Sequence, residues 1–357
     1  MWAVKKTAII LFNLGGPDKL DSVEPFLFNL FNDPAIIDAP SPVRWLLARY
    51  IAWKRAPIAS EIYRNLGGSS PLVGQTQQQA DALVELLNHE KSDREYRTFI
   101  AMRYWHPMSL AVAEAVRDYA PDDVVLLPLY PQYSSTTTGS SITEWRRAAA
   151  MAGLTARTRE ICCYPANQGW VDAQADLIGD ALKKYTGDTK PRIVFSAHGL
   201  PKKIIAKGDP YQWQVEQTVD AVVRRLRDME MPTLSWTLCY QSRVGPLEWI
   251  GPSTADELKK AGDEKTPVIV VPIAFVSEHS ETLVELDIEY RELAKGWGVA
   301  DYIRVPAVGT HASFIKGLAG LVGMAVSEQG VGRAIRCDNG ARLCPPNHSQ
   351  CPLTVPP

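Results

Sequence analysis

The sequence contains no long hydrophobic run and almost no excess of charge of either sign. No stretch reaches the ~18–20 apolar residues needed to span a bilayer. Lysine and arginine number 38 against 40 aspartate and glutamate, which gives a formal net charge of −2 over 357 residues. This balance argues against a nucleic-acid binder that relies on bulk electrostatics. With 46% hydrophobic residues the chain is too apolar to be disordered, and at ~100–200 residues per domain we expect two domains.

Several catalytic and nucleotide-binding signatures are also missing. The glycine-rich stretch at residues 66–71 has no P-loop lysine, and residues 13–17 do not follow the G-x-G-x-x-G spacing of dinucleotide-binding loops. The chain has neither a G-x-S-x-G elbow nor an H-E-x-x-H motif. These absences do not favour a nucleotide-binding protein, a serine hydrolase or a closed zinc site.

Short apolar runs alternate with amphipathic helical patterns, which is typical of doubly wound parallel sheets. The expected strands are residues 7–14, 98–103, 124–129 and 158–164, followed by 192–198, 233–240, 268–275 and 302–305. The expected helices include residues 75–88, 110–119, 171–185 and 214–227. We therefore predict an α/β protein of two lobes, each with a four-stranded parallel sheet. The N-terminal lobe is assigned to residues 1–170, the C-terminal lobe with a return helix to 171–335, and a loop-like, cysteine-rich tail to 336–357.

The segment at residues 25–53 is unusually apolar. It contains Phe26, Trp45 and Trp53 among many large apolar residues, and basic residues such as Arg49 and Arg55 lie within it or just after it. One interpretation is a pair of short core helices. The other is an exposed apolar lip that touches a membrane or a hydrophobic ligand, with the basic residues suited to an anionic lipid surface.

Polar clusters follow several of the expected strands, where ligands bind in open α/β sheets. His198 ends one strand of the second half, and residues 277–281 (S-E-H-S-E) follow another. Glu281, Glu285 and Glu289 recur at steps of four, which places three carboxylates on one helix face. His198 is either a structural histidine or a functional one. The carboxylates are either a solvated face or a partly buried row that accepts protons or passes a divalent cation. In the first half, the Ser/Thr run at residues 134–141 either caps a helix or binds an anion.

Three of the six cysteines fall in the last 21 residues. Cys337, Cys344 and Cys351 form C-x6-C-x6-C, with proline directly after the last two. We see no signal peptide and expect a cytoplasmic protein, in which cysteines are normally reduced. The equal spacing favours metal ligation over three unrelated cysteines. Three thiolates need a fourth ligand, and Cys162, Cys163 and Cys239 are the candidates. Cys239 lies in an apolar strand and is predicted to be a core residue.

Eight motifs in a fixed order give the chain a specific resemblance to the ferrochelatases, which insert Fe²⁺ into a porphyrin in the terminal step of haem synthesis. These motifs are N-L-G-G-P, Y-R-N-L-G-G-S-S-P, M-R-Y-W-H-P, Y-P-Q-Y-S-S-T-T-T-G-S-S, S-A-H-G-L-P, G-D-P-Y, C-Y-Q-S-R-V-G-P-L-E-W-I-G-P and P-I-A-F-V-S-E-H-S-E-T-L-V-E-L-D-I-E-Y. The resemblance runs from about Leu11 to Val305 and includes a C-terminal helix. It implies the class II chelatase fold, in which two Rossmann-like lobes hold the porphyrin in a cleft between them.

The resemblance also implies roles for individual residues. His198 matches the family's active-site histidine and Glu281 its acidic partner, and both are implied to handle Fe²⁺ or protons. Glu278, where some relatives have Asp, and His279 would be their neighbours, and Glu285 and Glu289 would continue the acidic row. Residues implied to line the macrocycle are Leu14 (Met in several relatives), Tyr63, Arg103, Tyr104, Tyr130 and Trp249, and residues implied to hold its propionates are Arg55 and Ser70.

Some ferrochelatases carry a [2Fe–2S] cluster held by three C-terminal cysteines and one distant cysteine. In animal relatives the distant cysteine falls in the Y-P-Q-Y-S segment, where this chain has Ser135. The resemblance therefore implies Cys337, Cys344 and Cys351 with Cys162 or Cys163 as the fourth ligand. Adjacent strand residues face opposite sides, so only one of these two should face the tail. We favour Cys162 and keep Cys163 as the alternative, with zinc as the competing metal.

We therefore expect an enzyme that inserts Fe²⁺, its metal substrate, into protoporphyrin IX to make protohaem. In this reaction His198, as a neutral imidazole, accepts a pyrrole proton. The alternatives are a coproporphyrin III ferrochelatase, a chelatase for another tetrapyrrole or metal such as cobalt, and a non-catalytic haem or porphyrin carrier. The carboxylate row favours an enzyme over a carrier, and the apolar lip favours protoporphyrin. We expect no nucleic-acid partner, a monomer or homodimer, and a peripheral contact with the inner face of the plasma membrane.

Overall fold

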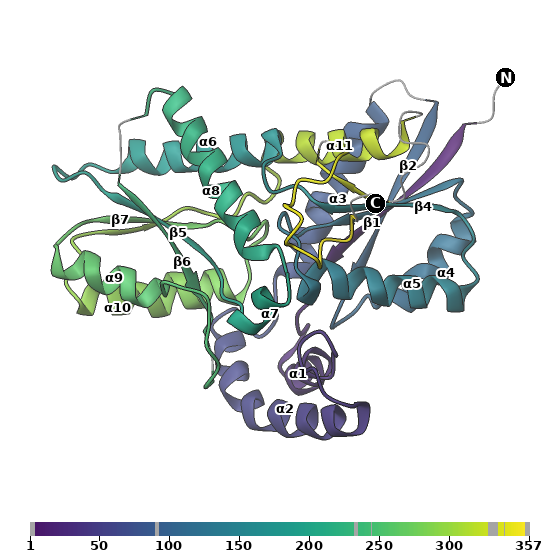
Figure 1. The fold of residues 1–357 in the computed structure, drawn as a ribbon, viewed down its shortest axis with the longest axis horizontal. Helices are drawn as coiled ribbons and strands as arrows, with labels where there is room; N and C mark the ends of the chain where they lie inside the picture. Colours follow the sequence, from purple (N-terminus) through teal and green to yellow (C-terminus); the bar gives the residue numbers. More distant parts are fainter. Residues whose placement is uncertain are drawn as a thin grey trace. The chain divides into compact units, whose positions relative to one another are not determined.

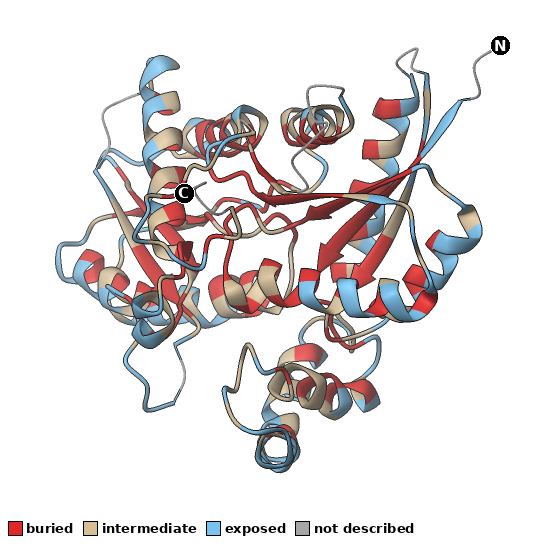
Figure 2. Cartoon of the chain, turned by 45° about the vertical axis from the view of Figure 1, so that its right-hand side comes forward, coloured by how far each residue is buried: buried red, intermediate tan, exposed pale blue. Residues whose placement is uncertain are grey.

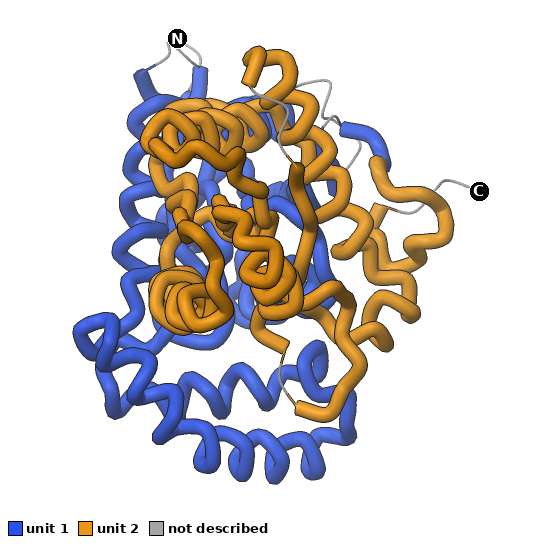
Figure 3. Tube along the Cα trace, turned by 90° about the vertical axis from the view of Figure 1, so that its left-hand side faces the viewer, with its two compact units in different colours: residues 1–163, 318–342 blue, residues 164–317, 343–357 orange. Residues whose placement is uncertain are grey.

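The computed structural model describes residues 4–89, 93–231, 235–243, 245–327, 335–338 and 340–353. Parallel strands alternate with helices along these residues (Figure 1). The chain divides into two compact units (Figure 3). The first unit comprises Met1–Cys163 and Leu318–Arg342, and the second unit comprises Tyr164–Gly317 and Leu343–Pro357.

The sheet of the first unit has five strands in the order β2-β1-β3-β4-β9, and all neighbours are parallel. Its strands are β1 (Lys5–Asn13), β2 (Arg94–Met102), β3 (Asp123–Pro128), β4 (Arg157–Cys163) and β9 (Ile335–Cys337). The prediction of four strands is therefore wrong for this lobe. The extra strand, β9, comes from a region that we assigned mostly to a loop-like tail. Its residues continue into the cysteine-rich tail, and only pairing with β4 defines this element.

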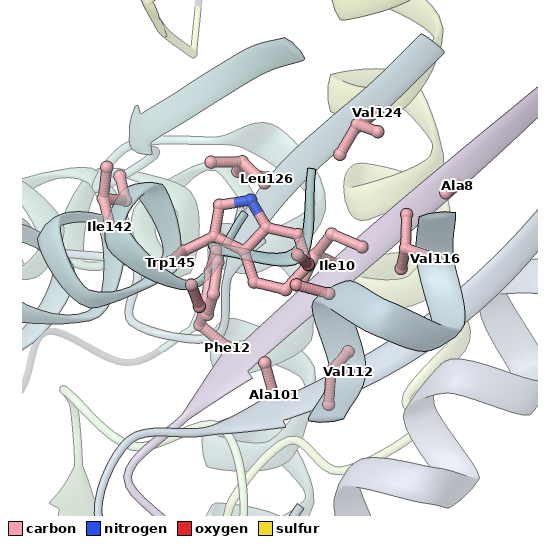
Figure 4. Packing of buried hydrophobic residues seen from close by; sticks show 13 residues of the cluster. Ala8, Ile10, Phe12, Ala101, Val112, Val116, Val124, Leu126, Ile142 and Trp145 are labelled. Carbon is pink, nitrogen blue, oxygen red and sulfur yellow. The ribbon is translucent and has the colours of Figure 1, made fainter. Parts of the chain in front are cut away.

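Helices α4 (Ser109–Tyr119) and α5 (Ser140–Ala152) pack on one face of this sheet. Figure 4 shows Trp145 of α5 among Ile10, Phe12 and Leu126 of the strands. The rings of Phe12 and Trp145 meet edge to face at 5.8 Å. The remaining helical elements of the first unit are η1 (Leu20–Ser22), α1 (Val23–Phe31), α2 (Ser41–Arg64), α3 (Leu72–His89), the π-helical turn η2 (Ser135–Gly139) and the second half of α11 (Ala312–Val326).

The apolar segment at residues 25–53 forms most of α1 and the first half of α2. Helix α1 packs its buried face on Ala52 and Tyr63 of α2. The opposite side of α2 is exposed, and we call it the α2 apolar face. Its large apolar residues are Val43, Leu46, Leu47, Tyr50, Trp53 and Ile58, each at least 41% exposed, whereas the Trp45 ring contacts Phe28 of α1. Of the two interpretations of this segment, the core helix describes α1, and the exposed apolar surface describes α2.

The sheet of the second unit has the four predicted strands, in the order β6-β5-β7-β8. They are β5 (Arg192–His198), β6 (Trp236–Gln241), β7 (Val268–Pro272) and β8 (Tyr302–Arg304). Thr233 and Leu234, which we included in the predicted strand 233–240, lie outside the described residues. The helical elements of this unit are α6 (Gln168–Lys184), α7 (Lys202–Ala206), α8 (Tyr211–Asp228), α9 (Thr254–Asp263), the π-helix η3 (Glu281–Tyr290), α10 (Arg291–Gly296) and the first half of α11.

The division expected from the sequence differs from these units in two places. The first unit ends at Cys163 rather than at residue 170, and the C-terminal part of the chain is shared between the units. The reason is that the chain returns: α11 ends in the first unit and β9 then pairs with β4. Figure 2 shows that strand residues of both sheets are mostly buried, whereas most helices have one exposed side. Among the described residues, no helix combines the length and the apolarity needed to cross a bilayer.

Candidate active site

The second unit brings two of the predicted histidines to one carboxylate. His198 is the last residue of β5, and Glu281 begins η3 in the segment that follows β7. His198 Nε2 lies 3.4 Å from Glu281 Oε1, and His279 Nε2 lies 3.8 Å from Glu281 Oε2. His198 Nδ1 is 2.6 Å from the carbonyl oxygen of Gly199. Because a carbonyl can only accept, Nδ1 carries a proton, and Nε2 is the atom left for chemistry.

The charges of this pair differ from the sequence-based expectation. Burial disfavours the imidazolium of His198, but the Glu281 carboxylate outweighs it and raises the pKa of His198 to about 9. Burial likewise disfavours the charged form of Glu281, but the His198 charge outweighs it and lowers the pKa of Glu281 to about 2. Burial lowers the pKa of His279. At neutral pH the metal-free site therefore holds an imidazolium–carboxylate pair and a neutral His279, which corrects our expectation of a neutral His198.

Glu285, one turn further along η3, is held by the last residue of β6 and by the residue after it. Its carboxylate accepts hydrogen bonds from Gln241 Nε2 at 3.0 Å, from Ser242 N at 2.8 Å and from Ser242 Oγ at 2.5 Å. Gln241 Nε2 also donates to the carbonyl of Glu281 at 2.9 Å. Burial and the Glu281 charge raise the pKa of Glu285, which makes it the easier carboxylate to protonate. Glu289 is exposed, so the row runs from the interior to the surface.

Sequence reasoning did not single out Gln241 or Ser242, and the only signal was their place in the C-Y-Q-S-R motif. It also expected an α-helix at this row. The structure has a π-helix instead, a form whose hydrogen bonds run from i to i+5 and which is frequent at functional sites.

Glu278, predicted as a neighbour of the pair, is engaged with a buried arginine. Its Oε1 accepts from Arg304 Nη1 at 2.7 Å and from Ala307 N at 2.9 Å. Arg304 also holds Asp287 of η3 with two hydrogen bonds, from Nε at 2.8 Å and from Nη2 at 2.6 Å. Arg304, which sequence reasoning missed, thus fastens both the start and the middle of the acidic segment to β8.

In the first unit, the predicted pair Arg103 and Tyr104 follows β2 and contacts Asp33. Asp33 Oδ2 accepts from Arg103 Nη2 and from the Tyr104 hydroxyl, both at 2.8 Å, and also from Ser140 Oγ. Tyr104 is fully buried in the hydrophobic cluster beneath α1. Its side chain therefore supports the surface behind Arg103 instead of forming that surface. Asp33 gave no signal in the sequence.

The other predicted porphyrin residues lie in varied surroundings. Tyr63 is buried in the same cluster, and Leu14 packs partly against it. Arg55 is exposed on α2, with its guanidinium 5.6 Å from the Phe31 ring centre. Ser70 Oγ accepts from Leu72 N at 3.3 Å at the start of α3.

Two predicted aromatic residues carry buried polar atoms. The hydroxyl of Tyr130 and the indole nitrogen of Trp249 are both buried, and no hydrogen bond to another described residue reaches either atom. In the Ser/Thr run at 134–141, the capping interpretation is confirmed, because Ser134 Oγ accepts from Thr136 N at 3.1 Å.

Three cysteines of the first unit converge. Their sulfur–sulfur distances are 3.4 Å for Cys162–Cys163, 3.3 Å for Cys162–Cys337 and 3.5 Å for Cys163–Cys337. The inference that only one of the adjacent pair faces the tail is therefore wrong. The β4–β9 register shifts between Ile161 and Cys163, and such a bulge breaks the alternation of a regular strand.

These cysteines have the donor chemistry of a sulfur-ligated metal centre. All three are buried, and the hydrogen bonds to Cys162 and Cys337 together with burial raise the pKa of Cys163. Three thiolates this close would repel one another, so a bound metal would be needed to hold them ionised. Cys344 and Cys351 belong to the second unit and are also buried. Gln214 Nε2 lies 3.1 Å from Cys344 Sγ. Cys239 is buried in the second unit's hydrophobic cluster, as predicted.

Solved structures show the class of fold. SirB from Bacillus subtilis with Fe³⁺ matches with a TM-score of 0.54 at 13% identity, covering 92% of this chain and 99% of that chain. A cobalt complex of the sirohydrochlorin chelatase SirB from Bacillus subtilis subspecies spizizenii matches with a TM-score of 0.51 at 13% identity, covering 92% and 98%. At this identity the likeness shows the fold alone. The chain is thus an α/β protein of the chelatase fold with a histidine–carboxylate site at the carboxyl ends of its strands.

Sequence comparison then shows the family. The ferrochelatase family model matches residues 6–325. The ferrochelatase of Pelagibacter ubique is 49% identical over 344 residues, covering 95% of this chain and 98% of that protein. The ferrochelatase of Caulobacter vibrioides is 52% identical over 315 residues, covering 88% and 89%. The chain belongs to the ferrochelatase family, which confirms the predicted enzyme class, a metal chelatase.

Proposed function

We propose that this enzyme inserts Fe²⁺ into protoporphyrin IX with release of two pyrrole protons. The observation that carries the proposal is the Glu281 carboxylate placed between His198 and His279, with Glu285 behind it. A porphyrin carrier needs an axial ligand but has no use for a row of carboxylates that ends at the surface. The arrangement therefore favours chemistry in which a cation arrives and protons leave.

In this proposal the resting proton on His198 must leave before the imidazole can act. A dication approaching Nε2 lowers the affinity of the imidazole for its proton, because like charges repel. The proton passes to the acidic row, where Glu285 has the raised pKa of an acceptor. His198, now neutral, can contact Fe²⁺ or accept the two pyrrole protons one after the other and pass each to the acidic row, and Glu281 balances the charge in either case. Both protons leave to solvent at Glu289, the exposed end of the row.

The proposed porphyrin-binding residues are those that the family resemblance assigns. Arg103, Leu14, Tyr130 and Trp249 line the macrocycle in the proposal, with Tyr63 and Tyr104 supporting them from behind. The buried Tyr130 hydroxyl and Trp249 indole nitrogen support it, since both have hydrogen-bonding capacity that the described protein atoms leave unused. Arg55 and Ser70 would hold the propionates. The guanidinium of an exposed arginine is well suited to this role, because it can form two parallel hydrogen bonds to one carboxylate.

The α2 apolar face favours protoporphyrin over coproporphyrin III and supports a peripheral membrane contact. Trp53 and Ile58 are 64% and 69% exposed, and Arg49 and Lys54 lie on the same helix, exposed. An amphipathic helix with aromatic and basic residues binds in the headgroup region of an anionic bilayer. Such a contact would ease transfer of a vinyl-bearing, membrane-soluble porphyrin.

We further propose a [2Fe–2S] cluster on Cys337, Cys344, Cys351 and Cys162, with Cys163 as the alternative to Cys162. The convergence of Cys162, Cys163 and Cys337 and the burial of the two remaining cysteines support it. When bound, a cluster of this type supplies a one-electron centre. The proton and metal steps above involve none of these cysteines. Zinc is the second candidate, favoured by the same thiol set.

An anaerobic fluorimetric assay tests the proposed function. Protoporphyrin IX fluorescence should fall with time when Fe²⁺ and enzyme are present, and coproporphyrin III should react more slowly. His198→Ala should abolish the loss of fluorescence while the porphyrin still binds in an equilibrium titration. Binding by the unaltered enzyme without metal insertion would leave only the carrier function, and undiminished turnover by His198→Ala would remove the role assigned to this residue.

A further inference from the structure

Asp33 is a buried carboxylate that the proposed chemistry does not use. It lies two residues after the end of α1, and its side chain is 2% exposed. Oδ2 accepts from Arg103, Tyr104 and Ser140, and Oδ1 accepts from Ala35 N at 2.8 Å. The donors come from the segment after β2 and from the start of α5. One carboxylate therefore joins the end of α1 to two segments at the carboxyl edge of the sheet.

The donors are also tied to one another. Arg103 Nε donates to Ser140 Oγ at 2.7 Å, and the Arg103 guanidinium lies 4.9 Å from the centre of the Tyr104 ring. Asn29 of α1 donates to the carbonyl of Tyr104 at 3.1 Å. A guanidinium held at Nε by one partner and at Nη2 by another cannot rotate without breaking a hydrogen bond. The Arg103 side chain is thus fixed in place, and its charge is balanced by Asp33.

Neutralisation of Arg103 has a consequence for the porphyrin carboxylates. The Arg103 side chain is 17% exposed and faces its own counterion at 2.8 Å. An arginine whose charge is already balanced attracts a second carboxylate weakly. Of the two arginines in the proposed porphyrin-binding set, exposed Arg55 is then the one better able to attract the propionates.

We propose that Asp33 is a positioning residue for porphyrin binding, which fixes Arg103 and holds α1 and α2 against the edge of the first unit's sheet. The inference rests on the proposed function, in which Arg103 lines the macrocycle. Asp33 itself touches neither substrate. Its effect is expected on porphyrin binding and not on the encounter with Fe²⁺, because the histidine–carboxylate site is built from other segments.

The test compares Asp33→Asn with Asp123→Asn. Asp123 starts β3 and forms a similar buried ion pair with Arg94, at 2.8 Å, but at the amino edge of the same sheet. Both variants should unfold at lower temperature. In an equilibrium fluorescence titration with protoporphyrin IX and no metal, Asp33→Asn should bind at least about tenfold more weakly, since a displaced wall residue loses its productive geometry. Asp123→Asn should bind as the unaltered enzyme does, and the KM for Fe²⁺ should be unchanged in both.

Equal porphyrin affinities for Asp33→Asn and the unaltered enzyme would overturn the inference, and so would an equal loss in Asp123→Asn. Arg103→Ala separates this failure from that of the proposed function. If Arg103→Ala also binds normally, the lining role of Arg103 is what fails. If Asp33→Asn does not fold, Ser140→Ala replaces it, because it removes the hydroxyl between Asp33 and Arg103 and keeps both charges. It should weaken binding in the same direction, and normal binding would again overturn the inference.

Discussion

At the scale of single residues, the site is defined by one carboxylate shared between two imidazoles of different charge. Glu281 stabilises the imidazolium of His198 and leaves buried His279 neutral. The resting site thus holds one labile proton at Nε2 of His198, the atom that faces Glu281. Metal insertion must displace this proton, so the pair sets the pH range in which the enzyme works.

We predict that kcat/KM for Fe²⁺ rises about tenfold per pH unit below the pKa of His198, because only the neutral imidazole can receive the cation. The rise should level off near pH 9, where His198 loses its proton in the folded enzyme. Glu281→Gln removes the charge that raises this pKa and leaves burial, which lowers it. The plateau should therefore begin at a lower pH in that variant, with a smaller maximum. Anaerobic rates at fixed porphyrin across the pH range measure both effects.

A second histidine–carboxylate pair of the same unit provides the control. His311 Nε2 lies 3.8 Å from Asp176 Oδ2, and Asp176→Asn should leave the pH profile where it is. A profile in Glu281→Gln that coincides with that of the unaltered enzyme would show that His198 is not the titrating group.

Residue-level chemistry was predictable from sequence where residue type and position suffice. His198 and Glu281 could be proposed because His198 ends one apolar strand and Glu281 lies in the segment after another, and ligands gather at that edge. Asp33, Ser242 and Arg304 could not be, because each acts on a residue more than 25 positions away in the chain. Charge state was also beyond reach, since the pKa of His198 depends on its distance from Glu281 and not on either residue alone.

At the scale of elements, η3 is anchored to β8 by Arg304. Arg304 is 10% exposed and pairs with both Glu278 and Asp287. We predict that Arg304→Gln destabilises the protein by about 3–5 kcal/mol, because it leaves Glu278 without its cation and leaves Asp287 only the more distant Arg291, at 3.5 Å. Urea unfolding followed by tryptophan fluorescence measures the loss. Fe²⁺ insertion should also fall in the folded enzyme, since η3 carries Glu281 and Glu285.

Lys183→Gln is the matched control in the same unit. Lys183 and Asp180 form an ion pair at 3.1 Å, but the two side chains are 71% and 59% exposed. Exposed pairs contribute about 0–1 kcal/mol, so this variant should unfold almost as the unaltered protein does. A comparable loss in both variants would mean that Arg304 is not a special anchor.

The cysteine centre also belongs to this scale, because it depends on the bulge in β4 and the pairing of β9. We predict that protein purified in air is amber-brown with visible absorption, and that Cys344→Ser and Cys162→Ser are colourless. Cys239→Ser should keep the colour, since Cys239 packs in the second unit's hydrophobic cluster and is not one of the proposed ligands. An unchanged spectrum in Cys344→Ser would remove the cluster, and colourless unaltered protein with one equivalent of zinc would identify the competing metal.

Elements with an apolar pattern were predictable, including the three-residue strand β8, whereas β9 and irregular features were not. The eight predicted strands all exist among the described residues, because parallel strands covered on both faces are apolar along their length. Strand β9 has three residues, and the β4 bulge is a local irregularity of pairing. Neither leaves a period in the sequence. The π-helix is likewise hidden, since residues four apart share a face in both helix types.

At the scale of the whole molecule, the α2 apolar face is the feature that a protein in water alone does not explain. We predict that the protein sediments with vesicles of phosphatidylcholine and phosphatidylglycerol at low salt. The triple variant Leu46→Ser, Trp53→Ser, Ile58→Ser should bind at least about tenfold more weakly, because each fully buried large apolar side chain contributes about 1.5–3 kcal/mol. Salt should weaken the binding of the unaltered protein, since Arg49, Lys54 and Arg55 are exposed cations near the lipid charges.

The double variant Met151→Ser, Leu293→Ser is the control for a general loss of surface hydrophobicity. These residues are 61% and 42% exposed on α5 and α10, and neither is part of the α2 apolar face. The double variant should sediment like the unaltered protein. With protoporphyrin IX dissolved in the vesicles, the triple variant should turn over more slowly, while water-soluble coproporphyrin III should report an intact active site. Equal vesicle binding by the triple variant and the unaltered protein would show that the α2 apolar face does not contact the membrane. The preference for protoporphyrin would then lose its physical basis.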